Sequence, residues 1–235
     1  MSEKQEEKRK TSDIILAQRR IRGQRSWACD NVAESITPLN RSVITAEAEQ
    51  AFGDFLSSLL IDWKNDPNSA DTPRRVAEMY VDELMAGRYE EQPNITAFPN
   101  TDSESRYAGM ITVRAEILSM CSHHHQPVKG VCYIGILPSM KVIGLSKYAR
   151  LAQWCARRGT LQEELTHQIA DVIQKETGTK DLGVYIQAEH GCMTNRGVLA
   201  HSSLTQTTEL RGQFYNPSVK SEFLANVQMQ QQHEK

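Results

Sequence analysis

Residues 111–137, ITVRAEILSMCSHHHQPVKGVCYIGIL, carry the pattern that decides the fold of this chain. The first seven residues alternate apolar and polar side chains, which is typical of a strand with one buried face. A second apolar stretch follows at 131–137, between a glycine and a proline. We therefore predict an antiparallel hairpin whose connection lies at 126–129. The cysteine and histidines at 121–125 then lie at the turn end of the pair.

The segments on either side of this hairpin predict four helices and two further strands. Apolar residues at helical spacing indicate helices at 45–63, 72–87, 148–155 and 161–173, and alternation indicates strands at 184–190 and 204–214. The order is two helices, two strands, two helices and two strands. This order predicts an α+β fold in which most strands pair antiparallel.

Two cysteines and one histidine form the strongest chemical signal in the sequence. Cys121 and His124 are three residues apart, and Cys192 follows much later in the chain. Thiolate and imidazole ligands suit zinc, and three protein ligands leave a fourth tetrahedral position open, as in hydrolytic zinc sites. His123 and His190 flank the two halves of this ligand set and are available to move protons.

A simpler interpretation of each cysteine has to be weighed against the metal site. A free cysteine is commonly a small buried hydrophobe, and a run of histidines can be surface decoration. Cys132 and Cys155 occupy apolar patterns, so we expect both in the core. Cys29 has no readable role. The distant Cys192, with its own neighbouring histidine, favours the metal site over coincidence.

Length and charge bound the class of protein. The 235 residues carry 27 Lys and Arg against 29 Asp and Glu, so no overall field attracts nucleic acid or an anionic membrane. No apolar run approaches a membrane span, and the first residues lack the hydrophobic core of a signal peptide. Five cysteines without framework spacing suit a reducing compartment. We expect a soluble cytoplasmic protein without nucleic-acid or membrane partners.

Composition also predicts the domain boundaries. Residues 1–40 are charged and poor in large apolar groups, which predicts a flexible polar arm. Residues 41–225 are expected to form the single folded domain, and 226–235 a polar tail.

Several short motifs occur in a fixed order between about Thr45 and Ala225. They are TPRR at 72–75, CSHH at 121–124, GLSKYAR at 144–150, QEELT at 162–166, HGCM at 190–193 and RG at 196–197. Together they resemble the GTP cyclohydrolase I family, of the tunnelling fold.

That resemblance implies an architecture and a reaction. The architecture is an antiparallel four-stranded sheet with two helices on one face and additional N-terminal helices. Sheets from several subunits of a homodecamer close into barrels, and active sites form between subunits. The implied reaction is zinc-dependent hydrolysis of GTP, which opens the imidazole ring, releases formate and gives 7,8-dihydroneopterin triphosphate. The product would begin pterin, folate or deazaguanine synthesis.

The resemblance also implies residue roles. Cys121, His124 and Cys192 match the zinc ligands, and His123 and His190 match the residues of proton transfer. Glu163 matches the carboxylate that anchors guanine, whose two parallel donors it can accept together. The remaining matches are substrate-binding positions, most of them around the triphosphate: Arg75, Leu145, Ser146, Lys147, Arg150, Gln162 and Arg196.

Two positions depart from the family pattern. Ser122 replaces a glutamate, and Glu78 replaces a lysine that would face phosphate. A carboxylate at position 78 is expected to repel the substrate tail.

Two other hypotheses stay open: an enzyme of the same fold that acts on a related purine or pterin, and a non-catalytic scaffold stabilised by zinc.

Overall fold

The computed structural model describes residues 10–101 and 106–232. The chain divides into two compact units, with the boundary between Glu91 and Gln92. The sequence predicted one folded domain beginning near residue 41, so the boundary differs. The first nine residues of the expected arm and the last three of the expected tail lie outside the described residues.

The first unit is helical. Its elements are α1 (Thr11–Ile21), η1 (Ala33–Ser35), α2 (Pro38–Ser58), α3 (Thr72–Glu78), the π-helical turn η2 (Met79–Leu84) and α4 (Ala86–Tyr89). The described part of the expected arm is therefore structured. α1 buries Ile15 and Arg19, and the Arg19 guanidinium donates to Ser26, Ser35 and the Arg25 carbonyl. A charged residue that is buried with its hydrogen bonds satisfied cannot be recognised from composition.

The apolar stripe predicted for residues 45–63 is only partly buried. Leu56 lies inside the unit, whereas Phe55, Leu59 and Leu60 are exposed by 54%, 55% and 95%. α2 ends at Ser58, and Leu60 has a left-handed φ of 60°, so the helical spacing does not continue.

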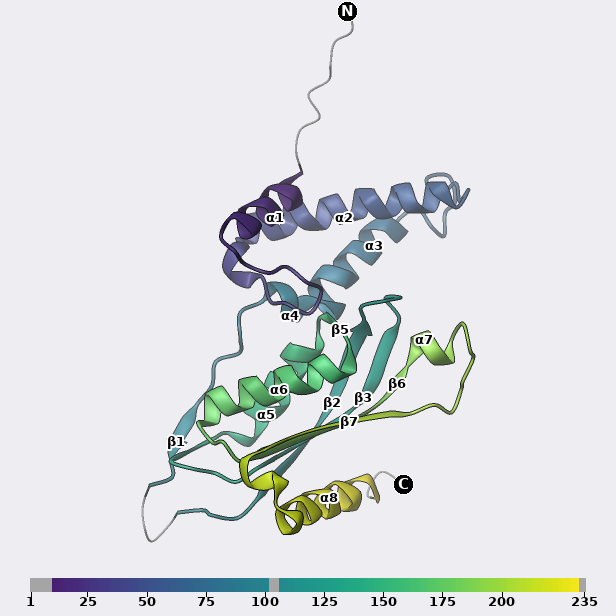
Figure 1. The fold of residues 1–235 in the computed structure, drawn as a ribbon. Helices are drawn as coiled ribbons and strands as arrows, with labels where there is room; N and C mark the ends of the chain where they lie inside the picture. The colour runs from purple at the N-terminus through teal and green to yellow at the C-terminus, as the bar shows by residue number, and fades with distance from the viewer. Residues whose placement is uncertain (1–9, 102–105, 233–235) are drawn as a thin grey trace, which may run out of the picture. The chain divides into compact units, whose positions relative to one another are not determined.

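The second unit is built on a sheet. Its strands are β1 (Ala97–Pro99), β2 (Ile111–Cys121), β3 (Pro127–Ile136), β4 (Lys141–Ile143), β5 (Gly159–Thr160), β6 (Leu182–His190) and β7 (Thr205–Arg211). The main sheet has the order β5-β2-β3-β6-β7 (Figure 1). A separate pair joins β1 to β4. The four long strands pair antiparallel, as predicted, and the short β5 adds a parallel pair at Met120 and Cys121.

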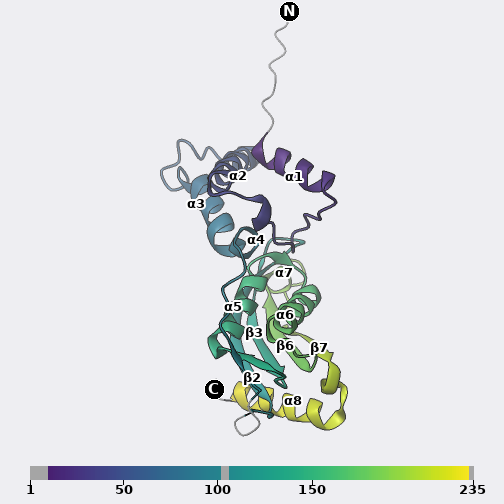
Figure 2. The same cartoon turned by 90° about the vertical axis from the view of Figure 1, so that its left-hand side faces the viewer.

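Each face of the sheet has its own core. α5 (Leu145–Ala156) and α6 (Gln162–Thr177) cover one face and pack on alternate strand residues such as Ile134 and Ile186. The other alternate residues, among them Tyr133, pack on η3 (Gly212–Tyr215) and α8 (Pro217–Gln232), the yellow helix in Figures 1 and 2.

Two glycines explain how α8 packs so closely. A Cβ at Gly135 or Gly183 would lie 2.6 or 2.7 Å from the ring of Phe223 or Phe214. The sheet therefore accepts both rings only where it lacks side chains. Residues 226–232, expected in a polar tail, belong to α8, because Phe223 and Val227 anchor this helix.

Strand register defines two ends of the sheet. At one end Met120 pairs with Pro127, and Val128 pairs with His190. At the other end Ile111 pairs with Ile136, just before β4 and the start of α5. We call these the turn end and the α5-start end. Figure 1 shows the β2–β3 turn and α7 at the first and β1 at the second.

Candidate metal centre

The first two candidate ligands come from the β2–β3 turn. Cys121 is the last residue of β2 and is 5% exposed, whereas His124 is exposed in the turn. The Cys121 amide donates to the Gln126 carbonyl at 3.0 Å, and the His125 amide donates to the Cys121 carbonyl at 2.9 Å. The connection therefore lies at 122–126, earlier than the predicted 126–129, because β3 extends back to Pro127.

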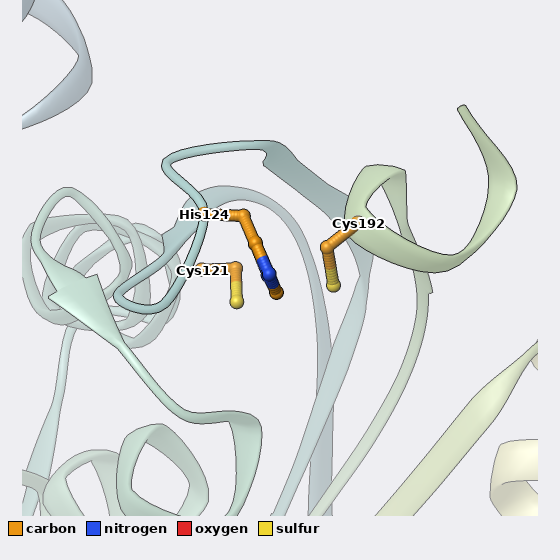
Figure 3. A group of neighbouring side chains, drawn as sticks. All are labelled: Cys121, His124 and Cys192. Atoms are coloured by element: carbon orange, nitrogen blue, oxygen red, sulfur yellow. The ribbon is translucent and has the colours of Figure 1, made fainter. Parts of the chain in front are cut away.

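The third candidate ligand comes from α7 (Gly191–Thr194), a single helical turn after β6. A Cβ at Gly191 would lie 3.0 Å from the Pro127 carbonyl, so this glycine lets α7 approach the hairpin. Cys192 then faces the turn. One ligand atom from each of Cys121, His124 and Cys192 lies within 4.8 Å of the other two, and Figure 3 shows their side chains pointing toward one another.

The chemistry of this donor set fits a metal ion. Burial and the adjacent Cys121 sulfur raise the pKa of the Cys192 thiol. The thiolates of Cys121 and Cys192 would place two negative charges close together, and a soft divalent ion would compensate both. By contrast, Cys132 and Cys155 are fully buried in the core, as predicted, and burial raises the pKa of Cys155 to about 11. The structure thus separates core cysteines from candidate ligands.

Arg196 contacts one of the candidate ligands. Its Nη1 donates to Nε2 of His124 at 3.0 Å. A nitrogen whose lone pair accepts this hydrogen bond cannot also hold a metal ion. Binding through Nε2 would therefore require Arg196 to turn away, while binding through Nδ1 would leave the contact in place.

The two histidines expected to transfer protons lie at the same end. His123 is exposed in the turn, with its ring centroid 6.3 Å from that of His124. His190 ends β6, and its Nε2 is 2.7 Å from Oε1 of Gln162. Burial lowers the pKa of His190, and the charge of Glu163 opposes part of that shift. Glu163 is exposed in the first turn of α6, close enough to influence this imidazole.

Gln162, an expected substrate-binding residue, is buried in this chain. It is 3% exposed, and its Nε2 lies within hydrogen-bond distance of the Ile186 and Thr205 carbonyls and of Thr207 Oγ1. The resemblance pointed to substrate contact. The helical spacing of Gln162 with Leu165 and Ile169 was the signal that it faces inward. Nothing in the sequence indicated the threonines around it.

Most of the expected triphosphate residues lie elsewhere. Leu145, Ser146, Lys147 and Arg150 form the first two turns of α5, at the α5-start end of the sheet. α5 reaches the turn end only at its C-terminus, where β5 pairs with Met120. Twelve helical residues span about 18 Å, so one chain does not bring these residues to the candidate metal ligands. Arg75 lies on α3 in the first unit.

The glutamate that departs from the family pattern has a local partner. Glu78 accepts from Arg74 at 3.0 Å, one helical turn away, and Arg75 pairs with Asp71 at 3.2 Å. All four side chains are about half exposed or more. The expected repulsion of a phosphate tail by Glu78 is therefore reduced by the positive charge beside it.

Fold and site define an α+β protein with a candidate Cys–His–Cys metal centre at one end of an antiparallel sheet. A family model described as GTP cyclohydrolase I matches residues 48–228, and the chain belongs to this family. This finding confirms the resemblance that the motifs indicated.

Individual relatives agree with this assignment. A GTP cyclohydrolase 1 of Shewanella sp. (strain W3-18-1) is 38% identical over 196 residues, covering 80% of this chain and 90% of that protein. One from Aeromonas hydrophila is 41% identical over 165 residues, covering 69% and 74%. Among solved structures, the archaeosine synthase QueF-Like in the apo form aligns with a TM-score of 0.37 and 11% identity, covering 44% of this chain and 93% of that one. At this TM-score the likeness carries no argument.

Proposed function

We propose that this chain hydrolyses GTP, opens the imidazole ring, releases formate and forms 7,8-dihydroneopterin triphosphate. The observation that carries the proposal is the convergence of Cys121, His124 and Cys192 within 4.8 Å, in a chain of the GTP cyclohydrolase I family. His190 and Glu163 at the same end supply a proton carrier and a carboxylate.

The ion that fits best is Zn²⁺. Two thiolates and one imidazole match its borderline-soft character, and three protein ligands are typical of hydrolytic zinc sites. When bound, the ion supplies Lewis acidity, which lets water act as a nucleophile near neutral pH. Cys121 and Cys192 would hold it from a strand end and a helical turn, which are rigid supports.

His123 and His190 would divide the proton transfers. The burial that lowers the pKa of His190 favours its neutral form, which can accept a proton. His123 lies in the exposed turn beside the ligand His124 and can exchange protons with solvent.

Glu163 would recognise the guanine edge. Guanine presents its N1–H and its exocyclic amine side by side, and one carboxylate accepts both. Glu163 lies in the first turn of α6, so its carboxylate is exposed at the turn end, near His190.

The triphosphate would be bound by residues of two chains. Ser146, Lys147 and Arg150 surround the N-terminus of the twelve-residue α5, where amides and cations favour phosphate. Their distance from the metal ligands within one chain supports a site completed by a neighbouring copy. Arg196 and Arg75 would add positive charge, and Leu145 would lie beside the base.

The edges of the sheet support such an assembly. In the described chain, β7 is a terminal strand, and β2 is paired on its outer side only where β5 covers Met120 and Cys121. Such edges pair readily with another chain. We propose that β2 of one copy pairs with β7 of the next, which closes the barrel of a tunnelling fold. The homodecamer of the family is the assembly that this pairing would build.

The direct test is incubation of the purified protein with GTP, followed by ultraviolet absorbance and fluorescence. A pterin product absorbs at longer wavelength than guanine and fluoresces, and formate should appear in equal amount. An unchanged spectrum with GTP, together with turnover of another purine or pterin nucleotide, would contradict the substrate assignment. No turnover of any of them by zinc-loaded protein would favour the scaffold hypothesis.

Within residues 10–101 and 106–232, no helix combines the length and apolar character needed to cross a membrane.

A further inference from the structure

Gln162 lies in a closed hydrogen-bond network between α6 and the strands β6 and β7. Two of its neighbours, the carbonyl oxygens of Ile186 and Thr205, lie 3.3 and 3.1 Å from Nε2. A carbonyl oxygen can only accept, so the amide nitrogen must face these two atoms. The reverse orientation of the amide would put Oε1 against two other oxygens. The direction of the Gln162 amide is therefore determined by its surroundings.

Two threonines fix the rest of the network. Thr166 Oγ1 donates to the Gln162 carbonyl at 2.7 Å, which uses its only proton. Thr207 Oγ1, 2.7 Å from Thr166 Oγ1, must then donate to it. The free lone pair of Thr207 accepts from Gln162 Nε2 at 3.0 Å. Every hydroxyl in this network thus has one consistent direction, and none competes for Oε1 of Gln162.

The fixed amide determines the tautomer of His190. Oε1 of Gln162 can only accept, and it lies 2.7 Å from Nε2 of His190. Nε2 must therefore carry a hydrogen. In the neutral imidazole, Nδ1 is then the one ring nitrogen with a lone pair. The hydrogen bond to Gln162 persists when Nδ1 gains a proton, so it holds the ring before and after transfer.

We propose that Gln162 is a positioning residue that holds His190 as the Nε2–H tautomer, so that protons enter and leave at Nδ1. The inference rests on the proposed function for its catalytic consequence, but not for the tautomer itself. It differs from a substrate contact, because Gln162 is 3% exposed and its amide groups already contact protein atoms.

The first test is spectroscopic and needs no substrate. Protein labelled with ¹⁵N-histidine should give a His190 signal with protonated Nε2, assigned by its loss in His190→Gln. Gln162→Met, which keeps the length of the side chain without an acceptor, should give a mixture of tautomers. Wild-type His190 protonated on Nδ1, or an unchanged tautomer in Gln162→Met, would overturn the proposal.

The second test separates positioning from substrate contact. Gln162→Met should keep its zinc and lower kcat about ten- to a hundredfold, the usual range for an orienting partner, with KM within about twofold. A raised KM at unchanged kcat would instead identify a substrate contact and overturn the proposal.

A matched control comes from the same helix. Gln174 also links α6 to β7, through Arg211 at 2.8 Å, but it does not contact His190. Gln174→Met should leave both the His190 spectrum and kcat unchanged. If wild-type protein fails to turn over GTP, the proposed function fails, while the tautomer experiment still decides the role of Gln162.

Discussion

The two ends of the five-stranded sheet differ in how completely one chain builds them. At the turn end, Cys121 is 5% and Gln162 is 3% exposed, and the candidate ligands converge within a single chain. At the α5-start end, Leu145 is 64% exposed, and Ser146 and Arg150 face solvent. One chain thus brings the candidate metal ligands together, whereas it leaves the proposed triphosphate residues exposed. The proposed sharing of one site between two copies would account for this difference.

The largest expected effect is loss of the metal at the turn end. Cys121→Ser removes one of three protein ligands, so zinc content and activity should both fall to background. Metal analysis and the GTP assay measure the two. Cys29→Ser in the first unit is the control and should keep both. Full zinc in the Cys121 variant would remove the proposed centre.

Removal of a proton carrier should preserve the metal. His123→Ala is expected to retain zinc and lose on the order of a hundredfold in kcat, as is usual for a general acid–base group. His125→Asn is the matched control in the same turn, because asparagine tolerates the left-handed φ of 50° there. Loss of zinc from the His123 variant would mean that His123 and His124 have exchanged roles.

Loss of the Glu163 carboxylate should have a smaller effect, confined to recognition of the base. Glu163→Gln offers a donor where guanine also presents donors, so the Kd for GTP should rise about ten- to a hundredfold. Glu164→Gln, at the next position of α6, is the control and should change the Kd for GTP by less than about twofold. Equilibrium binding of GTP and ATP measures both effects. Comparable affinity of the unmodified protein for the two nucleotides would contradict the guanine assignment.

Mixing defective chains compares the two ends directly. A Cys121→Ser chain has an intact α5-start end, and a Lys147→Ala/Arg150→Ala chain has an intact turn end. If each site takes one end from each of two copies, random mixing should restore about a quarter of the sites. Turnover after co-expression of both chains measures this recovery. Activity no higher than the sum of the separate variants would mean that each chain completes its own site.

The sequence predicted the second unit well because its signals are local. Alternation located β2 and β6, and an apolar run between a glycine and a proline located β3. Helical spacing located α5 and α6, because each of these helices buries one face against the sheet. The N-terminal part was predicted less well. Residues 10–40 include α1 and the start of α2. Composition did not predict this order, because it cannot show that the charged Arg19 is buried with hydrogen-bond partners such as Ser35.

The sequence by itself determined the candidate ligand types, the order of the four long strands along the chain, and the family. These depend on residue identity and on spacing within one element, which a sequence displays directly. Only the tertiary structure decided that α8 covers the second face, that Glu78 pairs with Arg74, and that Gln162 contacts His190. Except for the helical pair, these contacts join residues distant in the chain. The direction of each hydrogen bond also depends on every neighbouring donor and acceptor, which only the folded chain brings together.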